Sequence, residues 1–361
     1  MGNGADFNKN NLDFLRLVFA STVFLFHMHA LTNLTAFSAF GEYLSAPFAV
    51  RSFFVISGLL IYRSYNRSSS MRSYFEKRVR RIYPAYFAVI VLAAIALCPL
   101  SLLHPLQYYG ALGFWKYLAA NLLFLNFLAP SLPGVFTSNP NPAVNGALWT
   151  LKIEVAFYLC VPVIHYLCTR LGTKKTLGTL FFLSCLWKYG FGYLASVESS
   201  RSIYSLDSSR SVYEQLQVQF PGQLLYFIAG VLILLYFDNL VGHFRSIGLV
   251  TVCLFAIDHW FTKGNLDVLS ISGMVFVVGF WRYFGNFSKY GDFSYGVYIV
   301  HWPILQILIA FGLATRIAPE MFFLLCVILV VLVAMLLWVL VESRFLASGS
   351  HYRQVTAKGP A

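Results

Sequence analysis

The chain has 361 residues, of which 58% are hydrophobic and only 11% are charged. This apolar fraction exceeds what soluble globular domains use, so the composition indicates a polytopic membrane protein and excludes a large separate soluble domain. The net charge of +12 does not indicate nucleic-acid binding. Seven of the 26 Lys and Arg residues lie in one short stretch, 63–81. Basic loops beside membrane helices mark the cytoplasmic side of a membrane protein.

Ten apolar segments are long enough, or nearly long enough, to cross a bilayer as helices. They cover approximately residues 14–32, 46–62, 82–103, 146–168, 176–194, 220–237, 247–262, 268–284, 293–312 and 319–342. A further apolar stretch, 115–128, is shorter and carries Lys116, Asn121 and Asn126, so we predict that it is re-entrant or interfacial.

The basic stretch at 63–81 sets the predicted topology. If this loop lies in the cytoplasm, ten alternating spans place both termini there as well, provided that 115–128 does not cross the membrane. The predicted fold class is therefore an all-α membrane protein with about ten transmembrane helices. Its predicted parts are a cytoplasmic N-terminal tail over 1–11, a membrane domain over 12–345 and a cytoplasmic C-terminal tail over 346–361.

The first apolar segment carries two ionisable residues on one face. Arg16 and His27 are eleven positions apart, which on an α-helix places them within roughly 20° of the same direction and about 16 Å apart along the axis. Ionisable groups inside a spanning helix are costly unless they face a cavity or a partner, so we predict that this stripe lines a site. An imidazole that titrates near neutral pH suits a general base toward a hydroxyl. The alternatives are a histidine bonded between helices and an arginine that reaches the membrane boundary.

Small residues and clustered arginines follow. Ser57 and Gly58 give the second helix a small face where another helix or an extended ligand arm can approach closely. Arg78 and Arg81 stand one helical turn apart with Arg80 beside them, and such a cluster suits a phosphate-rich ligand at the inner surface. Helix packing and the positive-inside rule explain the same residues without a ligand.

Two further ionisable residues lie inside later spans. Glu154 is about 12 Å into its segment, where a carboxylate is unusual unless it has a function or a structural ion pair. His301 precedes Pro303, and a proline inside a helix removes one backbone hydrogen bond and kinks the span. We predict that His301 and the carbonyl freed by this proline face one cavity; a purely structural histidine is the alternative.

The six cysteines lie in or beside apolar runs and form no Cys-x-x-Cys pair. This pattern favours small buried apolar residues over a disulfide framework, and we expect no metal site.

Taken in order, these stretches resemble the successive motifs of the acyltransferase-3 family, the integral-membrane O-acyltransferases of O-antigens, Nod factors and exopolysaccharides. The matching stretches are Leu12–Arg16 with His27, Phe53–Gly58, Arg78–Pro84, Leu148–Glu154, Phe293–Tyr295 with His301–Pro303, and Val341 with Glu342. They run over nearly the whole chain. One departure is that Phe14 follows Asp13 where the family often has glycine.

The resemblance implies a ten-helix domain in the bacterial inner membrane, acetyl-CoA as the donor and a glycan or lipid-linked saccharide hydroxyl as the acceptor. Arg16 and His27 match the family's essential Arg and His of the first helix, and Arg78 and Arg81 match its paired-arginine motif, expected to serve the nucleotide end of CoA. The predicted partners are acyl-CoA, the acceptor and membrane lipids.

We therefore predict an acetyl-CoA-dependent O-acetyltransferase. Its predicted catalytic residues are His27, Arg16, Glu154 and His301, and its predicted cofactor-binding residues are Arg16, Ser57, Gly58, Arg78, Arg80 and Arg81. The sequence leaves open whether the group is acetyl or succinyl, and whether transfer is direct or passes through an acyl-histidine. The alternative function is a transporter or flippase for a lipid-linked sugar or small anion, but we find no internal repeat that would favour it.

Overall fold

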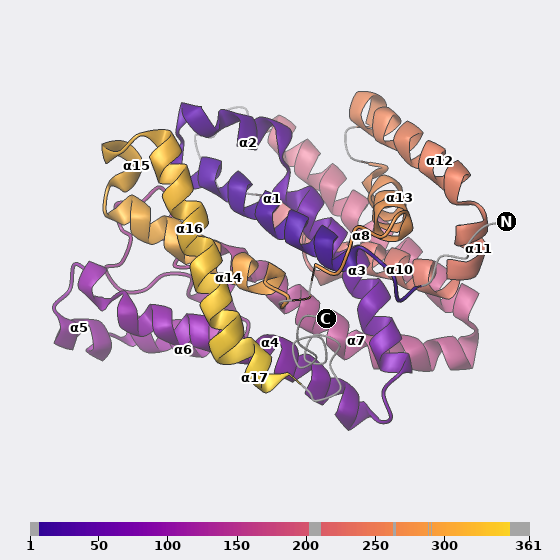
Figure 1. Ribbon diagram of the computed structural model, residues 1–361, viewed down its shortest axis with the longest axis horizontal. Helices are drawn as coiled ribbons and strands as arrows, with labels where there is room; N and C mark the ends of the chain where they lie inside the picture. Colours follow the sequence, from indigo (N-terminus) through magenta and orange to yellow (C-terminus); the bar gives the residue numbers. More distant parts are fainter. Residues whose placement is uncertain (1–6, 202–210, 263–264, 288, 290, 347–361) are drawn as a thin grey trace. The chain divides into compact units, whose positions relative to one another are not determined.

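The computed structural model describes residues 7–201, 211–262, 265–287, 289 and 291–346, and most of its α-helices are labelled in Figure 1. Over these ranges the chain is helical, and its strand-type pairing is a single isolated bridge between Ser101 and Val135. The α-helices are α1 (Leu12–Thr32), α2 (Ser38–Tyr43), α3 (Ala46–Asn66), α4 (Met71–Ala96), α5 (Pro105–Gly110), α6 (Leu112–Leu122), α7 (Trp149–Leu171), α8 (Thr173–Arg201), α9 (Val212–Gln217), α10 (Phe220–Leu235), α11 (Phe237–Gly242), α12 (Phe244–Ile257), α13 (Asp267–Phe280), α14 (Ser294–Ala310), α15 (Leu313–Arg316), α16 (Pro319–Leu337) and α17 (Ser343–Phe345).

Short helical turns complete the described chain. They are η1 (Thr35–Phe37), η2 (Cys98–Leu100), η3 (Asn126–Leu128) and η4 (Gly146–Leu148), with π-helical turns η5 (Asp258–Thr262) and η6 (Trp338–Glu342). Most of the two predicted tails, residues 1–6 and 347–361, lies outside the described residues.

Helices of membrane-spanning length are plentiful in the described chain, which confirms the all-α membrane class. Seven segments are long and apolar enough to cross a bilayer: Leu12–Thr32, Ala46–Asn66, Met71–Ala96, Gly146–Leu171, Thr173–Glu198, Val212–Leu235 and Pro319–Phe345. The other three predicted spans correspond to the shorter apolar helices α12, α13 and α14. The count of ten spans and the cytoplasmic position of the termini stay predictions.

The stretch predicted to be re-entrant or interfacial, 115–128, overlaps the short helix α6. Its eleven residues extend about 16 Å, which is too short for a hydrocarbon core of about 30 Å. The buried Asn121 amide nitrogen donates to the carbonyls of Tyr117 at 2.8 Å and Ala129 at 2.9 Å, and so joins the end of α6 to the chain that follows. Whether the stretch enters the membrane stays a prediction.

The basic stretch at 63–81 is mostly helical, and the prediction that it is a loop was wrong. Helix α4 begins at Met71, eleven residues before the predicted segment, and the turn between α3 and α4 covers only 67–70. The Ser70 hydroxyl accepts a hydrogen bond from the Ser73 amide at 3.1 Å, as a capping residue at a helix start does. The first turns of α4 were missed because their Arg and Lys residues lower the hydropathy although they favour helix.

The contacts divide the chain into two compact units. Unit 1 takes its described residues from Met1–Leu12, Arg51–Tyr74 and Ile153–Phe284, and unit 2 takes them from Asp13–Val50, Phe75–Lys152 and Gly285–Ala361.

In unit 1, α10 packs against α8 and α13, and it lies so close to α3 that two glycines are needed. A Cβ on Gly58 would collide with the carbonyl oxygen of Phe227, and a Cβ on Gly230 would collide with that of Val55. In unit 2, α14 packs against α16 (Figure 1), with Gly296 on Ala334.

Candidate active site

Two histidines from distant parts of the sequence meet inside unit 2. Helix α1 carries His27 and α14 carries His301, and the Nδ1 atom of His27 lies 2.9 Å from the Nε2 atom of His301. The two rings are nearly parallel, with their centroids 5.2 Å apart and an angle of 11° between their planes. His301 is fully buried, whereas His27 is partly exposed. Within the pair, therefore, the ring accessible to a reactant is that of His27.

The partners of the pair determine which nitrogen of each ring carries a proton. The Nδ1 atom of His301 lies 3.1 Å from the carbonyl oxygen of Val297, which can only accept, so this nitrogen carries a hydrogen. In the neutral ring the Nε2 atom of His301 is then an acceptor, and the Nδ1 atom of His27 must donate to it. The Nε2 atom of a neutral His27 is left with a free lone pair. This arrangement prepares His27 to take a proton.

The neighbouring Trp302 fixes the ring of His27 from the side. The two ring centroids are 4.8 Å apart in an edge-on arrangement, and the Trp302 indole nitrogen donates to the carbonyl of Ala143 at 3.1 Å. A side chain on Gly146 would collide with the indole ring, so this glycine leaves the space that Trp302 fills. The chain just before α7 therefore supports the histidine pair.

The carbonyl that Pro303 frees has found a partner. It belongs to Ile299, four residues before the proline, and it accepts a hydrogen bond of 2.8 Å from the Asn145 side-chain amide. The prediction that this carbonyl faces a cavity together with His301 was therefore wrong, because a buried carbonyl in a kinked helix is satisfied by the nearest donor.

A second cluster in unit 2 joins two of the predicted arginines. Arg16 of α1 and Arg81 of α4 both donate to the same carboxylate oxygen of Asp292, which lies just before α14. The other carboxylate oxygen of Asp292 accepts from the Ser294 amide at 3.2 Å and from its hydroxyl. Arg81 is also paired with the buried Glu342 of η6 at 3.5 Å.

The Asp292 carboxylate stays ionised in this cluster. Burial alone would raise the pKa of Asp292, but the guanidinium groups of Arg16 and Arg81 hold this pKa well below its ordinary value. Sequence reasoning did not assign a role to Asp292 or Glu342. Their signal was available, because each is a carboxylate at the edge of an apolar segment.

The remaining predicted residues are spread over both units. Arg78 of unit 2 is partly buried, whereas Arg80 is exposed and paired with Glu76 at 2.6 Å. In unit 1, Glu154 accepts a 2.7 Å hydrogen bond from the Tyr158 hydroxyl one turn further along α7.

The predicted cofactor residues on α3 also belong to unit 1. Gly58 is buried against α10 in the helix contact that was its alternative explanation, and Ser57 beside it is partly exposed. The predicted roles of Ser57, Gly58, Arg78, Arg80 and Glu154 in catalysis or cofactor binding stay predictions.

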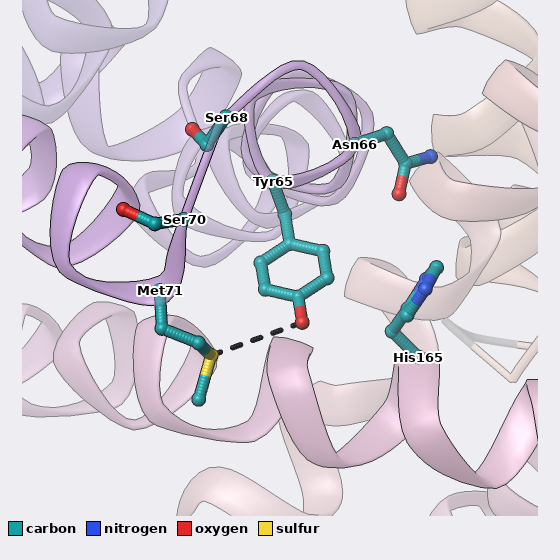
Figure 2. Close-up of a pocket in the computed structure, with 6 residues that line it drawn as sticks. All are labelled: Tyr65, Asn66, Ser68, Ser70, Met71 and His165. Atoms are coloured by element: carbon teal, nitrogen blue, oxygen red, sulfur yellow. Dashed lines mark hydrogen bonds between the residues drawn. The ribbon is translucent and has the colours of Figure 1, made fainter.

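Unit 1 also contains a polar pocket of about 400 Å³ beside the turn from α3 to α4. Figure 2 shows its lining residues, with the Tyr65 hydroxyl directed at the Met71 sulfur and His165 across from it on α7. The lining residues are Tyr65, Asn66, Ser68, Ser70, Met71 and His165. Hydroxyl and amide groups around an open space suit water or a polar ligand better than lipid tails.

Comparisons with known proteins give consistent matches. A family model described as an acyltransferase domain matches residues 9–339. The chain is 28% identical to Nodulation protein 10 of Rhizobium leguminosarum bv. viciae over 324 residues, which cover 84% of this chain and 85% of that protein. It is also 28% identical to an O-acetyl transferase of Shigella phage Sf6 over 353 residues, 95% of this chain and 97% of that one. O-acetyltransferase OatA of Staphylococcus aureus shares 24% identity over 333 residues, 81% of this chain and 50% of its own length. No solved structure matches significantly.

Proposed function

This chain belongs to the acyltransferase-3 family, and from that premise we propose that it moves an acyl group, in the first place acetyl, from acyl-CoA to a hydroxyl of a cell-envelope glycan or lipid-linked saccharide. The family match and the apolar helices identify the protein as an acyltransferase with several helices long enough to span a membrane. We also propose that the protein lies in the bacterial inner membrane.

The observation that carries the proposal is the directed contact between His27 and His301. The Nδ1–H group of His27 donates a hydrogen bond to His301. The lone pair on Nε2 of His27 is then directed to the acceptor hydroxyl, for which His27 acts as a general base. The hydroxyl oxygen forms a bond to the thioester carbonyl carbon as its proton passes to Nε2. The carbon–sulfur bond then breaks, and the leaving CoA sulfur receives that proton from Nε2 of His27. His301 acts as a positioning residue, because its bond to Val297 selects the nitrogen that accepts from His27.

The arginines support the donor half of the proposal. Arg16 and His27 lie on one uninterrupted helix, about 16 Å apart along its axis, and a pantetheine arm has a comparable reach. Arg16 and Arg81 present guanidinium groups at one place, and such groups bind phosphate by paired hydrogen bonds. We assign the CoA phosphates to this cluster, where Asp292 holds the two guanidinium groups in position.

The test compares wild-type protein with His27→Gln in an acyl-transfer assay. The substrates are acetyl-CoA and envelope glycan from a strain in which the gene for this protein is deleted. Loss of a general base lowers kcat by about 10²–10⁴-fold, and the acceptor gains one acetyl mass in the wild type only. Thermal unfolding in the presence of CoA checks folding and donor binding of both proteins, because a ligand of the folded state raises its stability. Wild-type turnover by a folded His27→Gln protein would contradict the proposal. A transporter would be indifferent to CoA.

A further inference from the structure

Unit 1 contains a charged cluster that the acyl-transfer proposal does not use. Asp267, at the start of α13, is 6% exposed and receives donors from three other helices. Lys188 of α8 donates to its Oδ1 atom at 2.7 Å, and Arg51 of α3 donates to its Oδ2 atom at 2.5 Å. The Tyr226 hydroxyl of α10 also donates to Oδ2 at 2.7 Å and accepts from Lys188 at 2.5 Å. One carboxylate is thus shared by two cations.

The two cations, Arg51 and Lys188, and the single carboxylate of Asp267 therefore have a net charge of +1. Lys188 is 3% exposed and its ammonium group is bonded to both Asp267 and Tyr226, so these two groups compensate the buried lysine. The Arg51 side chain is 26% exposed, and it is the member of the cluster that reaches an accessible surface. Burying a cation in a membrane protein costs free energy unless an anion is close to it. Asp267, the carboxylate that the two cations share, already accepts hydrogen bonds from three donors.

The guanidinium group of Arg51 has donors to offer a second anion. A guanidinium carries five N–H groups in a planar fork, and among the described residues the hydrogen bond of Arg51 is the one from Nη1 to Asp267. Asp267 and the ring of Tyr226, 5.8 Å from the guanidinium carbon, hold the fork in place. A prepositioned fork of this kind suits paired hydrogen bonds to a carboxylate or phosphate.

The position of Arg51 along α3 indicates which substrate brings that anion. Arg63 lies twelve residues further along the same helix, about 18 Å away. It stands at the end of α3 that leads into the turn at 67–70, within the basic stretch 63–81. Short basic segments mark the cytoplasmic side, so Arg51 belongs to the outer half of its helix, away from a donor that enters from the cytoplasm.

We propose that Arg51, held by Asp267, Lys188 and Tyr226, forms a binding site for an anionic group carried by the acceptor. This inference rests on the proposed function and narrows its substrate class to acceptors with a phosphate or carboxylate group.

The experiment measures anion binding to the full chain in detergent through thermal unfolding. The probes are sodium diphosphate, for a lipid-carrier phosphate, and glucuronate, for an acidic sugar, with glucose as the neutral comparison. Saturating CoA occupies the donor site, and NaCl keeps the ionic strength constant. Loss of a charge-assisted pair raises the apparent Kd of the favoured probe by about tenfold or more in Arg51→Gln. Arg170→Gln removes an exposed charge of α7 and should leave this Kd unchanged.

The outcomes are separable. Stronger binding of diphosphate identifies a phosphate, and stronger binding of glucuronate identifies an acidic sugar. Equal binding to wild type and Arg51→Gln, or no binding of either probe, overturns the proposal. If Arg51→Gln does not fold, a structure of wild-type protein with the bound probe decides, because an anion away from Arg51 also overturns it. Anion binding does not require acyl transfer, so a failure of the proposed function would be seen separately, in the transfer assay.

Discussion

At the scale of single residues, the candidate site depends on which nitrogen of each imidazole carries a proton. The backbone carbonyl of Val297 determines this for His301, and His301 determines it for His27. The charge that His27 gains during transfer is then met by an acceptor atom already in place. A variant that keeps an acceptor at position 301 should therefore differ from one that only keeps the volume.

We expect His301→Phe to lower kcat by about 10–100-fold, which corresponds to one lost hydrogen bond to a charged group. KM for acetyl-CoA should stay unchanged, because His301 makes no proposed contact with the donor. His301→Gln places an amide oxygen near the lost nitrogen and should recover part of the rate. Steady-state kinetics of both folded variants check this, and equal rates for the two would contradict the positioning role.

The carboxylate of Asp292 is the second residue-scale prediction. Asp292→Asn leaves Arg16 and Arg81 without their shared charge partner, and loss of one member of a buried ion pair destabilises a fold by about 3–5 kcal/mol. Glu76→Gln removes one member of the exposed pair with Arg80 and should cost about 1 kcal/mol or less. The measurement is the free energy of unfolding in mixed micelles, where equal losses for the two variants would refute the prediction.

The pH dependence of this contribution has a defined sign. Since the pKa of Asp292 is lower in the folded protein than in the unfolded chain, its ionised form stabilises the fold above the unfolded pKa. This stabilisation is lost as the pH falls from the unfolded pKa through the lowered folded value. The stability difference between wild type and Asp292→Asn should therefore shrink as the pH falls below the unfolded pKa of Asp292.

At the scale of elements, close contact between α3 and α10 shows how the membrane helices of unit 1 pack. Gly58 and Gly230 face the carbonyls of Phe227 and Val55, and this leaves no space for a side chain at either position. Small residues at such crossings let backbones approach, which is how helices associate where lipid removes the hydrophobic driving force.

We expect Gly58→Ala to destabilise the protein by about 1–3 kcal/mol, because the added methyl group meets backbone that cannot rotate away. Gly178→Ala is the matched control within α8, where a Cβ has nothing within 4 Å. It should be neutral or stabilising by up to about 1 kcal/mol, since alanine favours helix. Unfolding in detergent measures both, and a Gly58→Ala protein as stable as Gly178→Ala would show that the contact is absent.

At the scale of the whole molecule, the topology depends on how many of the apolar helices cross the membrane. Seven described helices have spanning length, and three apolar helices of 14 to 17 residues are shorter. The predicted topology of ten spans places the turn at 67–70 in the cytoplasm and the stretch at 104–145 outside. The proposed donor and acceptor require these opposite sides.

We expect Ser69→Cys to react with a membrane-impermeant maleimide only in inside-out vesicles, and Ser138→Cys only in spheroplasts. Both serines are exposed in the structure, and each variant is made in a background without the six native cysteines. Lysed membranes, in which both variants should react, provide the control for accessibility. Reaction of both variants from the same side would contradict the topology.

The sequence by itself determined the helical membrane class and the stripe of Arg16 and His27. These properties are local, because the length of an apolar run and the period of a helix are read within one segment. The resemblance in motif order also indicated the family, which the match over residues 9–339 confirmed. The start of α4 is equally local, but its basic residues concealed it from a hydropathy pattern.

Only the tertiary structure decided which side chains meet. His27 and His301 are 274 positions apart, and Arg16 and Arg81 are 276 and 211 positions from the Asp292 that joins them. No periodicity connects residues so far apart, and the contact depends on how helices cross. For the same reason the sequence assigns no role to Arg51. The structure shows that Arg51 and Lys188 both donate to the carboxylate of Asp267. A single segment records that a charge is buried, whereas the fold determines which opposite charge compensates it.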